Sequence, residues 1–473
     1  MTINRRRRRW VGLFGLVFAA ALGLTACGGG TSESTPDAVS FRGYVYPAAP
    51  QVGAGPLPEG IALDVKRLYN AFRFDDILPR LEDLGASGDA RLAWVIADYA
   101  TFNPGARLIE GAIGAFEELT GVTLSDDPAA KRIPARSMVN HLIAWDLPAP
   151  PEYRELKRIP FEERDARWRP FFEDEDSTID WRLISWGGVF LDNRPFEDPK
   201  PCPSSCIAAL DNPAVTDAAG GDWYPDHRLV FGIVINGEAR AYPKNIMESH
   251  EMVNDTIGGR DIGFAFCTLC GSAVAFFTDD LPEPFERPIL RTSGLLSRSN
   301  KVTFDLITFS IIDTFTGEAR SGPLREAGIF LTPVTVVTST WGDWKMAHPD
   351  TTIVAEDGGI GKIYPLDPLG NRDAGGPIFP VGDVDGRLPG RDEVLGVTAP
   401  DGTPIAFSVN EARVALALGQ TVELGGVTIV AAGSALTAIA GGEELISNQA
   451  FWFAWSQFHP ETLLWSPGGL ADQ

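Results

Sequence analysis

The second half of the chain contains an internal duplication. The pattern Trp-x-x-Trp-x-x-x-His-Pro begins at Trp341 and again at Trp452, and in both copies an acidic residue and a threonine follow the proline. Upstream, residues 232–242 are echoed by residues 396–407, and a glycine pair followed by Gly-Ser-Ala also recurs. The repeat predicts two related units that share one order of elements and pack together.

The duplication also distinguishes residues that serve the fold from residues that are candidates for a chemical function. Features that both copies retain, such as His348 and His459, are expected to serve packing. The second copy is shorter, and the shortening removes a pair of cysteines that only the first copy has. Cys267, Cys270 and His250 are therefore the better candidates for a functional site.

The cysteine pair lies in the apolar run Gly263-Phe-Ala-Phe-Cys-Thr-Leu-Cys-Gly-Ser-Ala-Val-Ala-Phe-Phe277. Two cysteines at this spacing form a redox-active disulfide, bind one metal ion, or remain an inert disulfide or thiol pair. The residues after Cys270 are typical of a strand, whereas a thioredoxin-like site continues as a helix. The pattern therefore predicts a strand-turn-strand, closer to the knuckle of rubredoxin-like metal sites.

His250 and Glu251 follow a segment that is typical of a short helix, ahead of the strand that carries the cysteines. If the chain returns His250 to Cys267 and Cys270, the three residues would suit Zn²⁺ or Cu(I), with one coordination position open. In a redox site, His250 would instead act as a base or a positive neighbour of a thiolate, assisted by Glu251. The alternative for His250 is a hydrogen-bonded ring in the core.

The N-terminus has the three parts of an export signal. Arg5 to Arg9 are followed by an apolar stretch and by Leu24-Thr-Ala-Cys27, which resembles a bacterial lipobox. We expect residues 1–26 to be a signal peptide, Cys27 to carry the lipid that anchors the protein to a bacterial membrane, on its periplasmic or outer-membrane face, and residues 27–58 to be a flexible tether. Export by the general or the twin-arginine route stays open.

The net charge limits the possible binding partners, and the cysteine content limits the possible disulfide bonds. The formal net charge is −23, and removing residues 1–26 with their five arginines makes it −28. Such an acidic chain is a poor candidate for binding nucleic acid. Four cysteines would remain beside the anchor, and in an oxidising compartment they allow three disulfide pairings, with Cys202 and Cys206 as candidates for a local one.

The fold class predicted from these patterns is α+β. Residues 59–147 show helical spacing of apolar residues and predict an α-helical, HEAT-like domain, and residues 148–180 are rich in Pro and mixed charge and predict a linker. After the linker, short alternating runs and hairpin turns predict a β-rich domain. Its first copy, with the cysteine pair, would span residues 181–390, and the shorter second copy residues 391–473.

Most of residues 180–466 resembles the bacterial and archaeal domain of unknown function numbered 3179. The resemblance rests on residues 207–213, 236–243, 250–255, 258–259, 293–295, 322–324, 341–350, 388–397 and 451–460, and above all on Cys267-Thr-Leu-Cys-Gly-Ser-Ala-Val-Ala-Phe276. It implies redox chemistry, because some family members are predicted selenoproteins with selenocysteine in this kind of pair. This chain departs from the family in having Thr268 where Pro is common, and in adding Cys202-Pro-Ser-Ser-Cys206.

Two hypotheses follow. The first is an exported lipoprotein whose site of Cys267, Cys270, His250 and Glu251 performs thiol redox chemistry or binds a soft metal; as an enzyme it would be a thiol-type oxidoreductase. The second is a non-catalytic envelope scaffold in which both cysteine pairs are structural disulfides. A hydrolase or nucleotide-binding protein is disfavoured, because the sequence contains no nucleophile elbow, P-loop or dinucleotide fingerprint.

Overall fold

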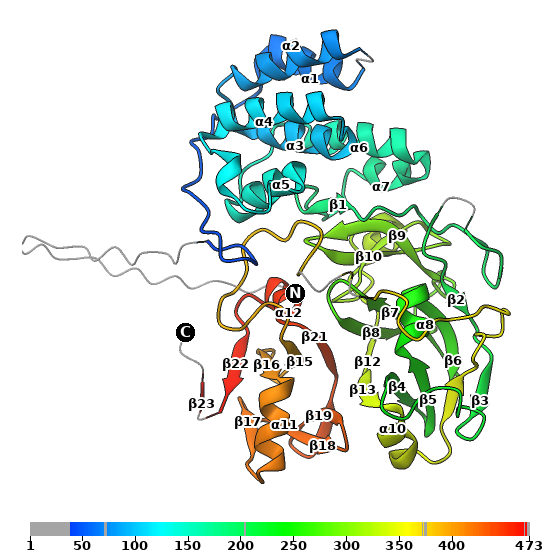
Figure 1. Cartoon of the computed structure of the whole chain (residues 1–473). Coiled ribbons are helices and arrows are strands. Elements are labelled where there is room, and N and C mark those ends of the chain that lie inside the picture. The colour runs from blue at the N-terminus through cyan, green and yellow to red at the C-terminus, as the bar shows by residue number, and fades with distance from the viewer. Residues whose placement is uncertain are drawn as a thin grey trace, which may run out of the picture. The chain divides into compact units, whose positions relative to one another are not determined.

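The computed structural model describes residues 38–70, 73–202, 205–370, 372, 376–467 and 469–470. Helices come first and are followed by a region of small sheets, so the predicted α+β class is confirmed (Figure 1). Residues 38–473 form one compact unit. The predicted signal peptide and Cys27 lie outside the described residues.

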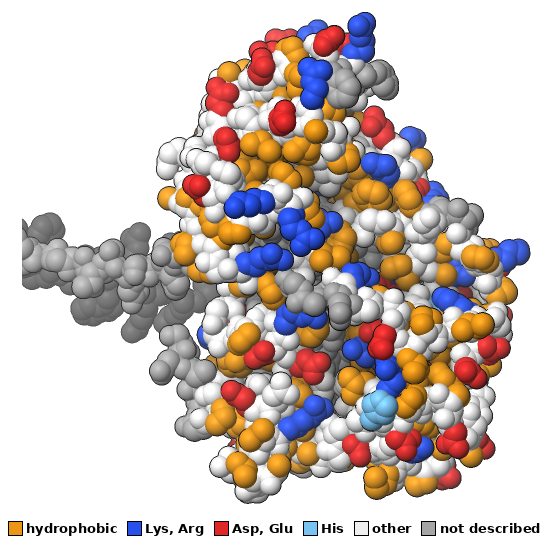
Figure 2. All heavy atoms as spheres, viewed as in Figure 1, with side chains coloured by type: hydrophobic (Ala, Val, Ile, Leu, Met, Phe, Trp, Pro, Cys, Tyr) orange, Lys and Arg blue, Asp and Glu red, His pale blue; other side chains and the backbone are white. Residues whose placement is uncertain are grey.

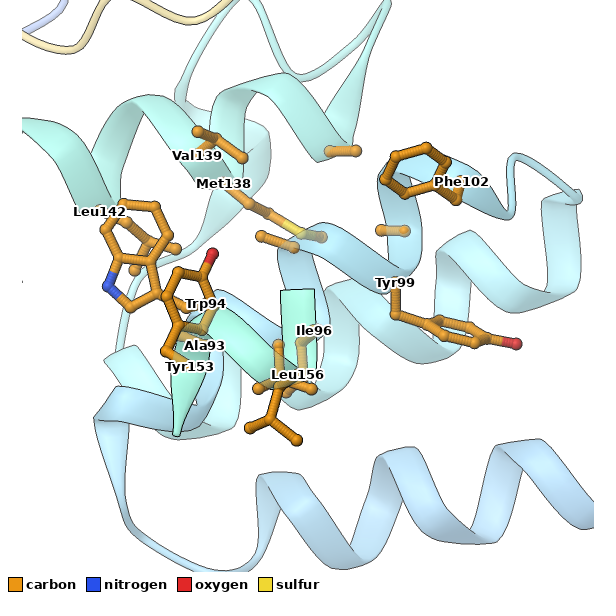
Figure 3. Close-up of a cluster of buried hydrophobic side chains, with 14 of the residues drawn as sticks. Ala93, Trp94, Ile96, Tyr99, Phe102, Met138, Val139, Leu142, Tyr153 and Leu156 are labelled. Atoms are coloured by element: carbon orange, nitrogen blue, oxygen red, sulfur yellow. The ribbon is translucent and has the colours of Figure 1, made fainter. Parts of the chain in front are cut away.

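Seven α-helices make up the N-terminal part of the described chain. They are α1 (Glu59–Tyr69), α2 (Phe74–Gly85), α3 (Ala93–Phe102), α4 (Ala106–Thr120), α5 (Pro134–Ala144), α6 (Tyr153–Arg164) and α7 (Arg169–Glu173). The central helix α3 is apolar on almost every side, which is the pattern of a helix buried among others. It packs against α4, α5 and α6, and Trp94 lies among side chains of α5 and α6 (Figure 3). A HEAT-like arrangement stays a prediction.

The predicted linker and tether are partly folded. Residues 148–180 contain α6 and α7, whose Phe161, Phe171 and Phe172 are buried in the helical core. The high content of Pro and charge obscured their helical period, since α6 carries Pro160 within the helix. At the start of the described chain, Tyr46 is buried and its hydroxyl donates to the carbonyl of Gly382 over 3.2 Å. The predicted tether of residues 27–58 therefore includes a packed segment.

Among the described residues, no helix has the length and apolar character needed to cross a bilayer.

The first copy forms two five-stranded sheets beside a four-stranded one. One has the order β13 (Val337–Thr340), β4 (Leu229–Ile235), β5 (Glu238–Pro243), β14 (Thr352–Val354), β3 (Val215–Asp217). The next has the order β12 (Pro333–Val334), β8 (Ser272–Phe277), β7 (Arg260–Cys267), β6 (Met252–Ile257), β2 (Leu210–Asp211). The third has the order β1 (Ile184–Trp186), β9 (Leu290–Ser297), β10 (Asn300–Asp305), β11 (Ile311–Asp313).

The second copy forms two sheets. One has the order β21 (Ser447–Phe451), β15 (Glu393–Thr398), β16 (Pro404–Ser408), β22 (Leu463–Ser466), β23 (Gly469–Leu470). The other is an antiparallel meander of β17 (Val422–Leu424), β18 (Val427–Ala432), β19 (Ala435–Ala440) and β20 (Glu443–Leu445). The remaining helices of the described β region are α8 (Lys244–His250), α9 (Gly322–Glu326), α10 (Trp341–Ala347), α11 (Val409–Ala417) and α12 (Trp452–Phe458).

The structure supports the internal duplication. In each copy an antiparallel hairpin, β4–β5 or β15–β16, is followed by a helix and a meander, and then by a strand that pairs with the first strand of the hairpin. A further helix, α10 or α12, leads to a last strand that pairs in parallel with the hairpin, as β14 does with β5 and β22 with β16. Every element of this series in the first copy therefore has a counterpart in the second.

The repeated tryptophans explain the repeated glycines. The ring of Trp344 lies against Gly232 of β4, and the ring of Trp455 lies against Gly396 of β15, where a Cβ atom would overlap the ring. Each indole N–H donates over 2.9 Å to a threonine hydroxyl seven residues later in the chain. Each tryptophan also packs on the histidine four residues later, with ring centroids 4.2 Å and 4.1 Å apart. These histidines, His348 and His459, serve packing as expected.

Each copy has a turn that contacts the start of a helix in the other copy. The turn between β7 and β8 meets the start of α12, where the N–H of Phe451 donates to the carbonyl of Cys270 over 2.8 Å. The equivalent turn between β18 and β19 meets the start of α10, where the N–H of Thr340 donates to the Ser434 hydroxyl over 2.8 Å. Strand β8 accordingly lies beside β21, and β19 beside β13. Each copy thus contributes one turn and two strands to the interface between the copies.

Replacing Gly396 with alanine tests this packing. The added methyl group would overlap the buried ring of Trp455, and overpacking of a core costs about 1–3 kcal/mol. The control is Gly114→Ala in α4, where the new methyl group meets no atom within 4 Å and alanine is a better helix former than glycine. Urea unfolding should show a loss of stability for Gly396→Ala and none for Gly114→Ala; equal stabilities would contradict the role of the Trp–Gly contact.

Candidate functional site

Cys267 and Cys270 lie side by side in the turn between β7 and β8. Cys267 ends β7, and Gly271 has a φ of +62°, a left-handed conformation that returns the chain into β8. The two Sγ atoms are 2.6 Å apart and are not bonded, against about 2.05 Å for a disulfide bond. Cys267 is 3% exposed and Cys270 is fully buried. The pair is therefore a buried dithiol within reach of disulfide formation.

The two thiols differ in acidity. Burial, the largest single influence, raises the pKa of Cys267, but the hydrogen bond that it accepts from Cys270, together with the backbone N–H and the charge of Lys301, brings the pKa below its usual value. For Cys270, burial and the same hydrogen bond both raise the pKa well above its usual value. Cys267 is therefore the sulfur that becomes the thiolate, and Cys270 is the one that keeps its proton.

A buried ion pair lies beside the sulfurs. The Lys301 ammonium donates to the Glu251 carboxylate over 3.2 Å and to the Thr292 hydroxyl over 2.6 Å. The Thr268 hydroxyl, between the two cysteines in sequence, donates to the same carboxylate over 2.8 Å. The charge of Lys301 lowers the pKa of Cys267, whereas the charge of Glu251 raises it. The network thus ties the cysteine turn to β9 and β10.

Backbone in a sparsely populated conformation surrounds the pair. Arg298 and Ser299, in the turn between β9 and β10, have φ values of +45° and +68°, and Glu251 has a φ of +55°. The carbonyl oxygen of Ser299 lies 3.4 Å from the Cys270 sulfur. The Arg298 side chain holds its turn in place by donating to the carbonyl of Val381 over 2.9 Å. Such conformations cluster at functional sites in proteins.

The second copy covers the sulfurs. Cys267 and Cys270 belong to an apolar cluster with Phe453 and Ala454 of α12 and with Val381. The hydrogen bond from Phe451 to Cys270 fixes the start of α12 against the cysteine turn. A reagent or partner therefore reaches the sulfurs only when this cover opens.

A cavity of about 290 Å³ lies next to the cysteine turn, with Thr268 and Gly271 in its wall. Its other walls include Phe451 and Gln449 of β21, so it lies between the two copies. Gln449 is 5% exposed, and its buried side-chain amide nitrogen has no hydrogen-bond acceptor among the described residues. A bound carbonyl or carboxylate oxygen would satisfy this donor.

The structure does not bring His250 to the cysteines. One ring nitrogen, Nδ1, pairs with the carbonyl of Ala208 at 2.6 Å, and the other, Nε2, pairs with the Tyr364 hydroxyl at 2.7 Å. Both positions needed for a metal bond or proton transfer are therefore taken. The predicted set of Cys267, Cys270 and His250 is not assembled, and the positive neighbour of the thiols is Lys301. Glu251 does reach the site, through Thr268.

Cys202 and Cys206 form a local disulfide, with Cα atoms 5.4 Å apart. Within the described part of the chain, their sulfurs and the Asp192 carboxylate are the only three donors of the Cys, His, Asp and Glu type close enough to share one ion. The disulfide occupies both sulfurs, and Asp192 accepts from Arg194 Nε over 2.8 Å and from the N–H of Ala209 over 2.9 Å. This group therefore does not fit a metal ion.

Sequence reasoning missed Lys301 and Gln449. Lys301 stands in a strand whose residues are all buried, and a lone cation in such a strand signals a buried ion pair. That signal was available in the sequence once the strand was assigned. Gln449 gives no such signal, because only the packing of the two copies places its side chain in the wall of a cavity.

The pH dependence of stability tests the place of His250. Burial, with a contribution from Lys362, lowers its pKa from 6.5 to about 4. Between these values the unfolded chain binds a proton that the folded chain does not, so His250 destabilises the fold as the pH falls from 6.5 to 4, by roughly 3 kcal/mol in all. In urea unfolding, the free energy of unfolding of the wild type exceeds that of His250→Gln, and this difference should decrease as the pH falls from 6.5 to 4.

Replacement of His227, which is exposed, serves as the control and should leave the pH profile as in the wild type. A constant difference between the wild type and His250→Gln from pH 7 to pH 4 would contradict a buried neutral imidazole.

The ion pair predicts opposite effects of two substitutions on Cys267. Glu251→Gln removes a charge that raises the pKa of Cys267, and Lys301→Met removes one that lowers it. At fixed pH, each unit of pKa changes the thiolate fraction by up to about tenfold. Alkylation of the reduced protein by iodoacetamide, located by mass spectrometry, should become faster in Glu251→Gln and slower in Lys301→Met. Changes in the same direction would contradict the electrostatic role of the pair.

The comparisons with known proteins identify a family of unknown function. No curated protein and no solved structure matches the chain. A family model described as "Protein of unknown function (DUF3179)" matches residues 204–443, just over half of the chain. The match contains Cys267 to Gly271 and the first copy from β4 to β14, and it reaches the second copy as far as β19, ahead of β21, α12 and β22. The chain therefore belongs to the DUF3179 family.

Proposed function

We propose that the protein is a thiol–disulfide oxidoreductase of the cell envelope, with Cys267 and Cys270 as its dithiol. The observation that carries the proposal is the 2.6 Å approach of two sulfurs that differ in pKa. No third Cys, His, Asp or Glu donor of the described residues lies close enough to share a metal ion with them. A dithiol therefore explains the geometry better than the Zn²⁺ or Cu(I) site that the sequence suggested.

The reaction is a two-electron exchange with a substrate disulfide. The Cys267 thiolate attacks one sulfur of the substrate, forms a mixed disulfide and releases the first substrate thiolate. The Cys270 thiol then passes its proton to the released substrate thiolate and attacks Cys267 Sγ, which releases the second substrate thiolate, to be protonated by water, and leaves a Cys267–Cys270 disulfide. The substrate disulfide is reduced to two thiols, and the protein dithiol is oxidised. The same steps in reverse oxidise a substrate dithiol.

Named residues support each step. Cys267 is the sulfur with the lowered pKa, and the charge of Lys301 favours its thiolate. Cys270 is held beside the Ser299 carbonyl, 2.6 Å from the sulfur that it must attack. The cavity that Thr268 and Gly271 line would receive the substrate before the cover over the sulfurs opens, with the amide of Gln449 as a hydrogen-bond donor to a carbonyl oxygen of the substrate.

The export part of the proposal rests on the disulfide and on the sequence. Disulfides persist in oxidising compartments, and Cys202–Cys206 is consistent with one. The predicted signal peptide and the lipid on Cys27 would then place the protein on the outer side of a bacterial membrane. The competing proposal, a non-catalytic scaffold, gains support from the same disulfide, and the state of the second pair decides between the two.

Trapping of the mixed disulfide tests the proposal. The reduced protein is treated with 5,5′-dithiobis(2-nitrobenzoate) as the substrate disulfide. The Cys267–Cys270 pair of the wild type should account for two thionitrobenzoate ions and keep no label, whereas in Cys270→Ser the remaining Cys267 should account for one ion and keep one label, as located by mass spectrometry. Cys267→Ser should react far more slowly. The Cys202→Ala/Cys206→Ala double variant is the matched control and should behave as the wild type at Cys267.

Two results would contradict the oxidoreductase. A Cys267–Cys270 disulfide that resists dithiothreitol until the protein unfolds would establish the scaffold. A stoichiometric metal ion in the purified protein, found by elemental analysis and lost in Cys267→Ser/Cys270→Ser, would establish a metal site.

A further inference from the structure

A second cavity, of about 410 Å³, lies in the helical part of the molecule. Helices α3, α4, α5 and α6 contribute to its wall, together with β1 and the segment at Phe379 and Pro380. Most of its lining precedes residue 204, where the match to the family begins. Its volume is within the range of about 300–1,000 Å³ that is usual for pockets that bind small molecules.

The walls of this helical cavity are mainly apolar. Phe102 of α3 stacks on Trp186 of β1, with ring centroids 5.8 Å apart and planes within 10° of parallel. Ile109 and Val139 add aliphatic surface from α4 and α5, and Phe379 adds an aromatic ring from the segment that precedes the second copy. Phe102 and Val139 also appear in Figure 3, at the edge of the helical core. Burial of an apolar ligand chain here would be favourable.

The lining of the cavity includes an arginine without an ionic partner among the described residues. The Arg136 guanidinium lies over the Phe379 ring, 4.6 Å from its centroid, and has no hydrogen bond or carboxylate contact within the described residues. Burial lowers its pKa. Arg132 stands exposed at the rim. An anion placed here would gain a charge-assisted hydrogen bond.

A third cation lines the cavity and is more buried than the two arginines. Lys157 is 2% exposed, and its ammonium donates to Asp98 over 3.0 Å and to the Tyr153 hydroxyl over 3.1 Å. An ammonium has three N–H groups, so one is left without an acceptor among the described residues. Asp98 neutralises Lys157, and the four charged residues that line the cavity give it a net charge of +2, in a chain of net charge −23.

We propose that this cavity binds an amphipathic carboxylate with a single apolar chain. The carboxylate would pair with Arg136, and the chain would lie between Phe102, Val139 and Trp186. The volume excludes a lipid with two long chains. Lys and Arg side chains gather across the middle of the face in Figure 2, between the helices and the sheets, and would attract an anion to this side of the molecule.

Calorimetric titration with octanoate tests the proposal. The wild type should bind one octanoate per chain, and 1-octanol, which has the same chain without the charge, should bind at least about tenfold more weakly. Arg136→Met should lose a similar factor for octanoate and keep the affinity for 1-octanol, whereas Arg136→Lys should retain most of the octanoate affinity. Arg67→Met, at an exposed arginine of α1, is the matched control and should bind as the wild type.

Two outcomes would overturn the proposal: no saturable binding of octanoate by the wild type, or equal affinities in the wild type and Arg136→Met. Thermal unfolding in the absence of ligand checks that each variant is folded. The helical cavity does not involve the dithiol, so Cys267→Ser/Cys270→Ser should bind octanoate as the wild type does. Failure here therefore leaves the proposed oxidoreductase untouched.

Discussion

The β region depends on the exchange of turns between its two copies. In one contact the cysteine turn of the first copy accepts a hydrogen bond from Phe451, and in the other the Ser434 turn of the second copy receives one from Thr340. Ser434 also donates its own N–H to the Asp343 carboxylate over 2.8 Å. Gly271 and Gly433 make both turns possible, with φ values of +62° and +61°. Without these contacts the copies would lose their shared interface and the sulfurs their cover.

The lowered pKa of Cys267 favours reaction of the dithiol, but the burial of both sulfurs protects them from reagents. Cys267 has a lowered pKa, mainly because Cys270 donates a hydrogen bond to it against the effect of burial. The ion pair of Lys301 and Glu251 is neutral overall, so it tunes this balance without dominating it. Since Phe453 and Val381 cover both sulfurs, the rate of any reaction depends on how often the cover opens as well as on the thiolate fraction.

The sequence predicted what short patterns encode. The duplication was visible because each repeated tryptophan contacts the histidine four residues later and the threonine seven residues later, which keeps these residue types at the same spacing. The cysteine pair was visible because its turn is local. The position of His250 was not visible. It ends α8, and the left-handed Glu251 redirects the chain, so that the imidazole meets Ala208 and Tyr364 instead of the neighbouring strand's end. Lys301 reaches the cysteines through the β9–β10 hairpin, a contact between distant segments that spacing cannot reveal.

The exchange of turns has the geometry of a symmetric dimer. Strand β8 meets β21 while its counterpart β19 meets β13, and the equivalent strands β13 and β21 meet each other, as elements do at a two-fold axis. The single polypeptide therefore holds both halves of an isologous interface. Only the first copy carries the sulfurs, so the molecule has one dithiol, although the equivalent turn of the second copy has the same backbone conformation at its glycine. The chain therefore has no equivalent dithiol in its second copy that could exchange electrons with the first.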